Sequence, residues 1–268
     1  MSKNRLDNLL ASKNNIENIQ KAKGMILAGL IFVDGQRIDK AGTMIDTDSI
    51  ITVKETLPYV SRGGYKLAKA VKQFSINLQN KVVIDVGAST GGFTDVSLKN
   101  GAGIVHAVDV GKNLLHYKLC KEKNVINHEK INFRNIDFDT IGEKVDVIVC
   151  DVSFISLKKI VHSFIQFCKE YTDIIILIKP QFEADRKYIC KGGVVRDKNV
   201  HSMVILEIID DFLTYDLKLM GLTSSPIKGP KGNIEYLAYF TLGKLKTEKF
   251  DYMAVVEKVV NEEYSYHS

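Results

Sequence analysis

Short apolar segments rich in Val and Ile alternate with segments of helical periodicity from residue 82 onward. Four of these segments have the length and β-branched content of buried strands: VVIDV (82–86), GIVHAVDV (103–110), VDVIVCDV (145–152) and DIIILIKP (173–180). Residues 92–99 and 200–215 have the periodicity of the helices that connect such strands. The alternation is typical of a doubly wound, Rossmann-like α/β domain, in which ligands bind outside the carboxyl ends of the strands.

Further elements follow from the same patterns. LKLMGLTSS (217–225) and IEYLAYFTL (234–242) are predicted to be strands that close the sheet, and INFRN (131–135) is predicted to be a short strand. Ser156 has the side chain of a helix cap, and the apolar spacing after it predicts one amphipathic helix that reaches Cys168.

The first 60 residues have a pattern of their own. Residues 19–30 are predicted to be a helix, LIFVDGQRI (30–38) a strand pair with a turn at Asp34-Gly35, and residues 49–53 a second short strand. Residues 1–70 hold eleven Lys and Arg against seven Asp and Glu, whereas residues 71–268 hold twenty-six against twenty-five. Most of the net positive charge therefore lies in residues 1–70. This charge indicates either binding to a polyanion or simply a solvated face.

Several classes of protein do not fit the composition. The longest apolar run, residues 24–33, is far shorter than the roughly 20 residues that cross a bilayer. The N-terminus has charges where a signal peptide needs an apolar region, so we expect a cytoplasmic protein without a membrane span. The four cysteines form no C-x-x-C pair, which predicts buried reduced thiols and no metal site.

The segment VVIDVGASTGGFTD (82–95) reads as a buried strand that runs into a glycine-rich turn and opens a helix. Two phosphate-binding motifs fit this turn poorly. The G-x-x-x-x-G-K-[ST] loop requires a Lys where this chain has Phe93, and the G-x-G-x-x-G motif requires a Gly where it has Ser89. A hydrolase nucleophile is a third reading, because residues 87–91 satisfy G-x-S-x-G in the correct context. That reading needs a late His, for which only His201 and His267 are candidates.

An S-adenosylmethionine site is the fourth reading, since that ligand needs small residues at the turn and no phosphate-binding Lys. Asp85 can reach its amino group or a loop water, Asp109 can accept both ribose hydroxyls, and Asp137 can meet the adenine edge. Asp109 can instead cap a turn, and for Asp137 the alternative of capping an adjacent helix is equally open. The predicted cofactor-binding set is Asp85, Gly87, Ala88, Ser89, Gly91, Gly92, Phe93, Asp109, Val110 and Asp137.

Two resemblances to known families sharpen these predictions. RLDNLL followed by KAKGMILAGLIFVDGQRI resembles the RNA-binding domain of the ribosomal S-four type, over most of residues 4–54. The rest of the chain resembles the TlyA-type ribosomal RNA 2′-O-ribose methyltransferases, a family often labelled hemolysin A. That resemblance rests on seven motifs in order: PYVSRGGYKL, DVGASTGGFTD, AVDVG, CDVSFISL, LIKPQFE, KGGVVRD and SPIKGPKGNIEYL.

The second resemblance implies a catalytic domain of the FtsJ kind with a Lys-Asp-Lys-Glu tetrad at Lys66, Asp151, Lys179 and Glu235. In the roles it implies, the two carboxylates orient the lysines and Lys66 helps to hold the ribose. A lysine acts as a base only when neutral, a form that burial and a second cation favour and a neighbouring carboxylate opposes. Whether Lys179 is the base or stabilises the oxyanion stays open here.

The resemblances also imply a division of the chain and its partners. Residues 1–57 are expected to bind RNA, 58–65 to link the parts, and 66–268 to form the methyltransferase domain. The expected partners are ribosomal RNA or ribosomal subunits, with a cytidine as target, and the predicted RNA contacts are Lys21, Lys23, Arg37, Lys40 and Arg62. Methylation of an amino group commonly uses an Asn/Asp-Pro-Pro-aromatic motif, and the prolines of this chain form none. Methylation of a pyrimidine carbon needs a nucleophilic Cys, whereas Cys150 lies in an apolar run and is predicted to be part of the core. A non-catalytic RNA-binding protein and a haemolysin remain as alternatives.

Overall fold

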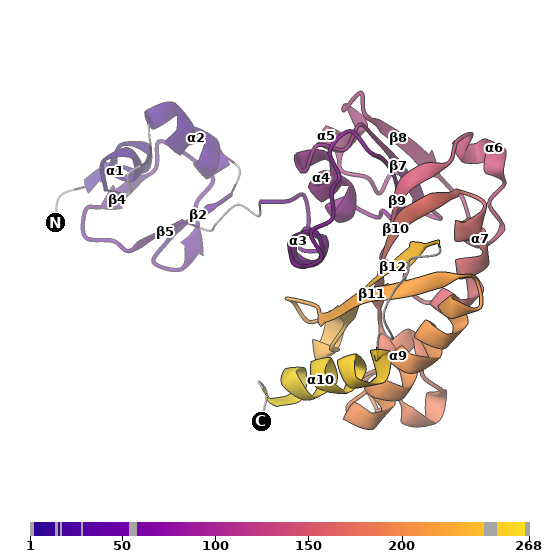
Figure 1. The fold of residues 1–268 in the computed structure, drawn as a ribbon. Helices are drawn as coiled ribbons and strands as arrows, with labels where there is room; N and C mark the ends of the chain where they lie inside the picture. The colour runs from indigo at the N-terminus through magenta and orange to yellow at the C-terminus, as the bar shows by residue number, and fades with distance from the viewer. Residues whose placement is uncertain are drawn as a thin grey trace. The chain divides into compact units, whose positions relative to one another are not determined.

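The computed structural model describes residues 3–13, 16, 18–27, 29–53, 58–243 and 251–265 (Figure 1). The chain forms two compact units, Met1–Pro58 and Tyr59–Ser268, and each is described by itself. Residues 59–65, which the sequence analysis treats as a linker, belong to the second unit, and helix α3 already begins at Gly64.

The first unit is a helix pair packed on two small sheets. Strands β1 and β4 pair antiparallel, and β2 pairs with both β3 and β5. Leu6, Leu10, Ile26 and Ile31 are fully buried at the centre of its core. The elements are β1 (Lys3–Arg5), α1 (Leu6–Lys13), α2 (Ile19–Leu27), β2 (Ile31–Val33), β3 (Gln36–Arg37), β4 (Met44–Asp46) and β5 (Ile51–Val53).

Helix α2 ends earlier than the predicted residue 30. Gly29 has φ +69°, a left-handed conformation that glycine adopts without strain, and the amide of Leu30 donates to the carbonyl of Met25. The chain then turns directly into the hairpin of β2 and β3, as the Asp34-Gly35 turn predicts.

Seven of the described strands of the second unit form one sheet in the order β11-β12-β10-β9-β6-β7-β8. Strands β6 to β10 run parallel, and β12 lies antiparallel between β10 and β11. The strands are β6 (Val82–Val86), β7 (Ile104–Asp109), β8 (Val125–Glu129), β9 (Val145–Cys150), β10 (Cys168–Ile178), β11 (Leu217–Ser224) and β12 (Tyr236–Leu242). The strands predicted at 82–86, 103–110, 145–152, 173–180, 217–225 and 234–242 are all present, with slightly different ends.

Helices cover both faces of this sheet (Figure 1). One face packs against α3 and α4, through core residues such as Val83 and Val147. The other face packs against α7, α9 and α10, through residues such as Ile148 and Ile174. The helices are α3 (Gly64–Gln73), α4 (Gly92–Lys99), α5 (Tyr117–Cys120), α6 (Phe138–Ile141), α7 (Val161–Ile165), α8 (Pro180–Glu183), α9 (Lys198–Leu213) and α10 (Tyr252–Ser265). The Rossmann-like fold class is therefore confirmed, and α4 has the bounds that the sequence predicts.

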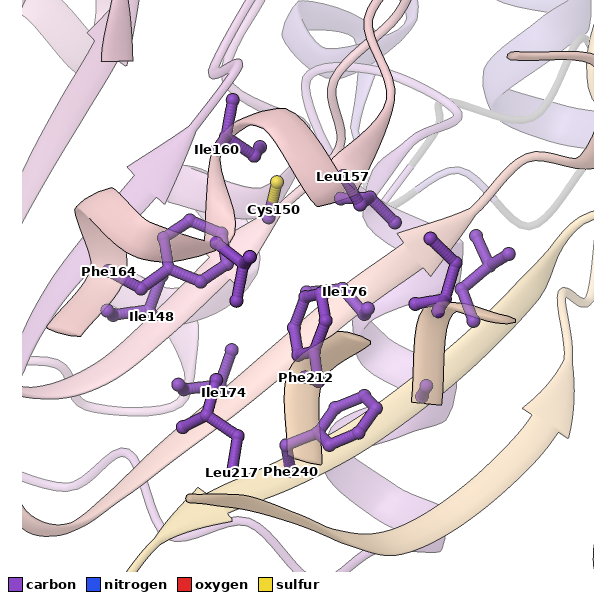
Figure 2. Packing of buried hydrophobic residues seen from close by; sticks show 14 of the residues in the cluster. Ile148, Cys150, Leu157, Ile160, Phe164, Ile174, Ile176, Phe212, Leu217 and Phe240 are labelled. Atoms are coloured by element: carbon purple, nitrogen blue, oxygen red, sulfur yellow. The ribbon is translucent and has the colours of Figure 1, made fainter. Parts of the chain in front are cut away.

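Figure 2 shows the larger of the two core layers, where Phe164, Phe212 and Phe240 pack over Ile148 and Ile176. These side chains are fully buried. Alternate residues of the central strands supply the two layers, as a sheet covered on both faces requires.

Two predicted elements are wrong. INFRN is not a strand: Phe133–Asn135 form one 3₁₀ turn, which Asn132 caps by accepting from the amide of Arg134. The strand in this region is β8. It lies at the edge of the sheet and is half exposed, which is why its sequence, VINHE, is largely polar. The helix predicted from Ser156 to Cys168 is a 3₁₀ turn at Leu157–Lys159, followed by the short α7, and Cys168 opens β10.

The cysteine prediction is half right. Cys150 and Cys168 are buried free thiols, whereas Cys120 and Cys190 are exposed. Cys120 ends the short helix α5, and Cys190 lies in a surface loop. The apolar residues near each of them in the sequence therefore do not make either cysteine part of the core.

Candidate active site

Two adjoining cavities lie at the carboxyl ends of the parallel strands. The larger, which we call the strand-end crevice, has a volume of about 450 Å³ and is lined from the loops after β6, β7 and β9. The smaller, which we call the tetrad cavity, has a volume of about 280 Å³ and is lined by all four residues of the predicted tetrad. Gly87, Ser89, Asp151 and Ser153 line both cavities, so the two share a wall.

The sheet brings the tetrad together from four distant parts of the chain. Asp151 directly follows β9 and Lys179 directly follows β10, at the carboxyl edge of two neighbouring parallel strands. Glu235 directly precedes β12, and because β12 is antiparallel, its start lies at that same edge. Ile178 pairs with Tyr236, so Lys179 and Glu235 flank one register position. Lys66 enters from the first turn of α3.

The four side chains form a chain of ion pairs. Lys66 Nζ lies 2.7 Å from Glu235 Oε2 and 3.6 Å from Asp151 Oδ2, and Lys179 Nζ lies 2.6 Å from Asp151 Oδ1. Lys66, Lys179 and Glu235 are at most 8% exposed. Two lysines thus balance two carboxylates, as charges removed from water require.

Lys179 also donates to Ser153 Oγ at 2.8 Å. An ammonium group has three N–H donors, and Asp151 and Ser153 occupy two of them. No third acceptor contacts Lys179 among the residues that the structure describes, so the third N–H can meet an oxygen atom in the cavity.

Glycines allow the loops of the site to approach each other closely. Gly87 has φ +80°, and a Cβ there would lie 2.8 Å from the backbone oxygen of Asp151. A Cβ on Gly92 would lie 2.8 Å from the amide nitrogen of Gly64, where α3 begins. Any larger residue at Gly92 would push α3, and Lys66 with it, away from α4.

Asp85 is fully buried at the end of β6 and lines the tetrad cavity. Its Oδ2 accepts from the hydroxyl of Thr94 at 2.6 Å, while Oδ1 has no hydrogen-bond partner in the described structure. Burial raises the pKa of the Asp85 carboxyl to about 7, and the nearby Asp151 charge adds to the rise although the Thr94 bond opposes it. The cavity therefore holds an uncompensated acidic group that a bound cation would stabilise.

Asp109, at the end of β7, holds the loops on both sides of the strand-end crevice. Its Oδ2 accepts from the amide of Ser89 at 2.8 Å, and its Oδ1 accepts from the amide of Gly111 at 2.7 Å. Ser89 has φ +49°, and this bond holds it in that left-handed conformation. Each carboxylate oxygen keeps a second lone pair for a ligand hydroxyl.

Most members of the predicted cofactor-binding set line one of the two cavities. Gly87, Ser89, Asp109 and Val110 line the strand-end crevice, and the residues that line the tetrad cavity are Asp85, Gly87, Ala88, Ser89, Gly92 and Phe93. Gly91 lines neither, because it caps α4 with φ +92° against Leu115 and Leu119.

Asp137 is the second member of the set that lines neither cavity. It precedes α6 and borders a separate hollow with Phe138, Asp139 and Thr140. Its expected position rested on the strand INFRN, which does not exist. Asn132 and Phe133 line the strand-end crevice instead.

Of the two histidines that the hydrolase reading could use, the one that the structure describes lines neither cavity. His201 is buried at the start of α9, where its ring nitrogens lie 2.8 Å from the Tyr236 hydroxyl and 3.0 Å from the carbonyl oxygen of Val195. Both nitrogens are therefore used in packing α9 on the sheet. His267 lies outside the described residues.

Two residues at the site, Ser153 and Phe154, are not among those that the sequence predicts. Ser153 binds Lys179, and Phe154 lies at the mouth of the strand-end crevice with 90% of its surface exposed and φ +65°. The Phe154 ring contacts that of Phe182, with centroids 5.0 Å apart. An exposed aromatic ring in a strained backbone conformation can stack on a base, but neither feature is visible in the sequence.

The predicted RNA contacts lie on the surface of their units. In the first unit, Lys21 lies on α2, Arg37 on β3 and Lys40 just after it, all exposed, while Lys23 on α2 is half-buried. Arg62 is exposed in the second unit, two residues before α3.

Two further findings concern metals and membranes. Within the described ranges, no three His, Cys, Asp or Glu side chains are grouped so that they could ligate a metal ion. None of the helices in those ranges combines the length and the apolar content needed to cross a bilayer.

Comparison with known proteins identifies the family of this fold and site. Residues 59–242 match the model of the FtsJ-like methyltransferases, and residues 4–51 match the model of the S4 domain. The chain belongs to the FtsJ-like methyltransferase family. The match spans the whole sheet and all four tetrad positions, and the S4 match spans most of the first unit, so this chain is a methyltransferase with an S4 domain.

Relatives cover nearly the whole chain. It is 43% identical to a Brachyspira hyodysenteriae protein named Hemolysin A, over 89% of this chain and 100% of that one. It is 35% identical to a Mycobacterium tuberculosis protein named 16S/23S rRNA (cytidine-2′-O)-methyltransferase TlyA, over 88% of each chain. A solved structure from Streptococcus thermophilus, whose name includes the word hemolysin, is 38% identical with a TM-score of 0.75, over 99% of this chain and 97% of that one.

Proposed function

We propose that this FtsJ-like methyltransferase transfers the methyl group of S-adenosylmethionine to the 2′-oxygen of a ribose in ribosomal RNA. The observation that carries the proposal is the tetrad, because its paired lysines and carboxylates line a cavity that shares a wall with a ligand-sized crevice. The name of the Mycobacterium tuberculosis relative supports ribosomal RNA as the substrate and a cytidine as the target. We place the reaction in the cytoplasm, with ribosomal RNA or a ribosomal subunit.

The residues present fit S-adenosylmethionine, which bears a sulfonium and an amino group. Four carboxylates, those of Asp85, Asp109, Asp151 and Glu235, line the two cavities. Asp85 is the one that has a buried oxygen without a partner among the described residues. Around them, the crevice is lined mainly by apolar side chains such as Val108 and Ile160. A site of this volume and lining is typical of small-molecule and cofactor sites.

When bound, S-adenosylmethionine supplies an electrophilic methyl group. In our proposal Asp85 and Asp109 hold the cofactor's amino group and ribose hydroxyls, and Asn132 with Phe133 takes the adenine side in place of Asp137. Gly87 lets the backbone lie close to the ligand, since no side chain fits there.

The tetrad prepares the nucleophile. A ribose hydroxyl attacks poorly until its proton is drawn away, so a group must accept a hydrogen bond from it or stabilise the developing alkoxide. We assign Lys179 the second role, with its remaining N–H donated to the 2′-oxygen, because Asp151 and Ser153 accept from the other two. Lys66, held by Glu235, can bind a ribose oxygen beside it. The hydroxyl proton would pass to solvent water as the 2′-oxygen takes the methyl group, and the cofactor would leave as the neutral thioether.

The test is to map 2′-O-methyl groups on ribosomal RNA from cells with and without this protein, and to transfer methyl groups in vitro to the unmodified subunits. We expect at least one ribose methylation to depend on the protein. Absence of S-adenosylmethionine binding in calorimetry would leave only an RNA-binding role. Haemolysis by purified protein that persists in Lys179→Ala would support the activity named for the Brachyspira relative instead.

A further inference from the structure

Two loops of the second unit bring three cations to one cleft on its surface. The cleft has a volume of about 340 Å³ and lies between the loop before α9 and the loop that joins β11 to β12. Its charged lining residues are Arg196, Lys228 and Lys231, all exposed, and no carboxylate lines it. No ion pair within the described ranges involves any of the three. We call this surface the cationic cleft.

The two loops are fastened to each other. Asn233 is 4% exposed, and its side chain donates to the carbonyl of Gly193 at 3.0 Å and accepts from the amide of Val195 at 3.4 Å. Its own carbonyl accepts from the amide of Gly229 at 2.8 Å. The buried amide thus holds the backbone that carries the three cations, so binding an anion there needs little reordering.

A contact with the C-terminal helix adds to this rigidity. The Tyr264 hydroxyl, on α10, donates to the carbonyl oxygen of Arg196 at 2.8 Å. The loop before α9 is therefore held from both sides.

The loop between β11 and β12 contributes to both the cationic cleft and the catalytic site. Ile234 lines the cleft, and the next residue, Glu235, lines the tetrad cavity. Gly229 packs against the Glu235 carboxylate so closely that a Cβ there would collide with Oε1. Lys228 is the neighbour of that glycine, so the loop that helps to position the tetrad also carries the cations.

We propose that the cationic cleft binds the phosphate backbone of the RNA next to the target nucleotide. This inference rests on the proposed function and adds a second RNA-contact surface, on the catalytic unit itself. An open cleft with three cations and no carboxylate favours a polyanion over a neutral or cationic ligand. The phosphates that flank a ribose are only a few bonds from its 2′-oxygen, and Lys228 is the neighbour of the glycine that packs on Glu235, so a backbone that leaves the tetrad cavity past Glu235 would come within reach of these cations.

The test uses the full-length protein with unmethylated ribosomal subunits from cells that lack it. We expect Lys228→Gln/Lys231→Gln to raise KM for the subunit about tenfold at moderate salt, and to reduce the slope of log affinity against log salt by about 2, one for each lost phosphate contact. Lys228→Arg/Lys231→Arg, which keeps both charges, should stay near the parent. The matched control is Lys123→Gln/Lys144→Gln, since these exposed lysines precede β8 and β9 at the opposite edge of the sheet.

If the parent methylates the subunit, the proposed function stands, and any of three outcomes would overturn the inference about the cleft. An unchanged salt slope, or equal losses in the control, would show that the cleft does not contact the backbone. A fall in kcat alone would mean that the loop acts only through Glu235. Competition by inorganic phosphate beyond that of chloride at equal ionic strength would indicate a site for a free anion. No methylation by the parent would instead reject the proposed function.

Discussion

Asp151 is the residue on which the charge balance of the site depends. It contacts Lys179 through one oxygen and Lys66 through the other, and it raises the pKa of Asp85 from a distance. Removing either lysine leaves a poorly hydrated carboxylate, whereas a ligand cation can compensate both Asp151 and Asp85. Substitutions at these positions should therefore separate binding of the cofactor from transfer of the methyl group.

Lys179→Ala and Asp109→Ala should fail in different ways. Lys179 occupies the tetrad cavity, so its loss should lower transfer by about 10²-fold or more while S-adenosylmethionine still binds. Asp109 holds Ser89 and Gly111 around the strand-end crevice, so its loss should first raise the Kd for the cofactor. Calorimetry and single-turnover transfer measure the two effects. Equal cofactor affinity in Asp109→Ala and the parent would contradict our placement of the ribose.

Asp85 makes stability depend on pH. Its folded-state pKa of about 7 lies above the ordinary value of about 3.9, so the folded protein binds this proton more tightly. Stability from this group is present below pH 4 and is lost as the pH rises to about 7. At pH 8 the free energy of unfolding of Asp85→Asn should therefore be about 2 to 4 kcal/mol higher than that of the parent. At pH 4 the two values should be nearly equal.

Urea titrations from pH 4 to 8, without cofactor, measure this difference. Thr94→Ser, which keeps the hydroxyl that donates to Asp85, is the control and should follow the pH dependence of the parent. Curves for Asp85→Asn and the parent that stay parallel over this range would show that the carboxyl titrates normally.

At the scale of elements, the sequence predicts the parts whose pattern is set by burial. The central strands β6, β9 and β10 are covered on both faces, so each contains a short segment that is almost entirely Val, Ile and Leu. The edge strand β8 is half exposed and has no such pattern, so the strand is predicted at INFRN instead of at Val125–Glu129. The segment after Ser156 has helical spacing, but its last residue, Cys168, pairs in β10, and tertiary contacts decide such a boundary.

The site was predictable to a similar extent. Residues next to well-predicted strand ends, such as Asp151 and Lys179, gather as the topology requires, and the family resemblance selected them. Asp137 was misplaced because its strand was. Ser153 and Phe154 were missed because a side-chain contact and a left-handed backbone leave no periodic trace in a sequence.

The loop between β11 and β12 should be intolerant of a methyl group at Gly229. Gly229→Ala would place a Cβ against the Glu235 carboxylate and displace it from Lys66. We expect kcat to fall about tenfold or more, with little change in cofactor affinity, because Glu235 does not line the strand-end crevice. Gly24→Ala is the control, since a Cβ there meets no atom within 4 Å. Unchanged kcat in Gly229→Ala would mean that the position of Glu235 does not matter.

At the scale of the whole molecule, two units with separate cores divide the work that we propose. The first unit holds eight Lys and Arg against seven Asp and Glu and has the S4 fold, and the second holds twenty-nine against twenty-five and carries both cavities. Phosphate contacts supply affinity that depends on salt, whereas the chemistry depends on the tetrad. Neutralising surface lysines of the first unit should therefore weaken RNA binding and leave the cofactor site intact.

Lys21→Gln/Lys40→Gln tests this division in the full-length protein. Both residues are exposed, so the change should not disturb the core of the first unit. We expect weaker binding to the unmethylated ribosomal subunit and a salt slope reduced by about 2, with the Kd for S-adenosylmethionine equal to that of the parent. Lys123→Gln/Lys144→Gln removes the same charge from the second unit and should change neither quantity. Equal loss of RNA affinity in both variants would mean that net charge alone, and not a surface of the S4 domain, attracts the RNA.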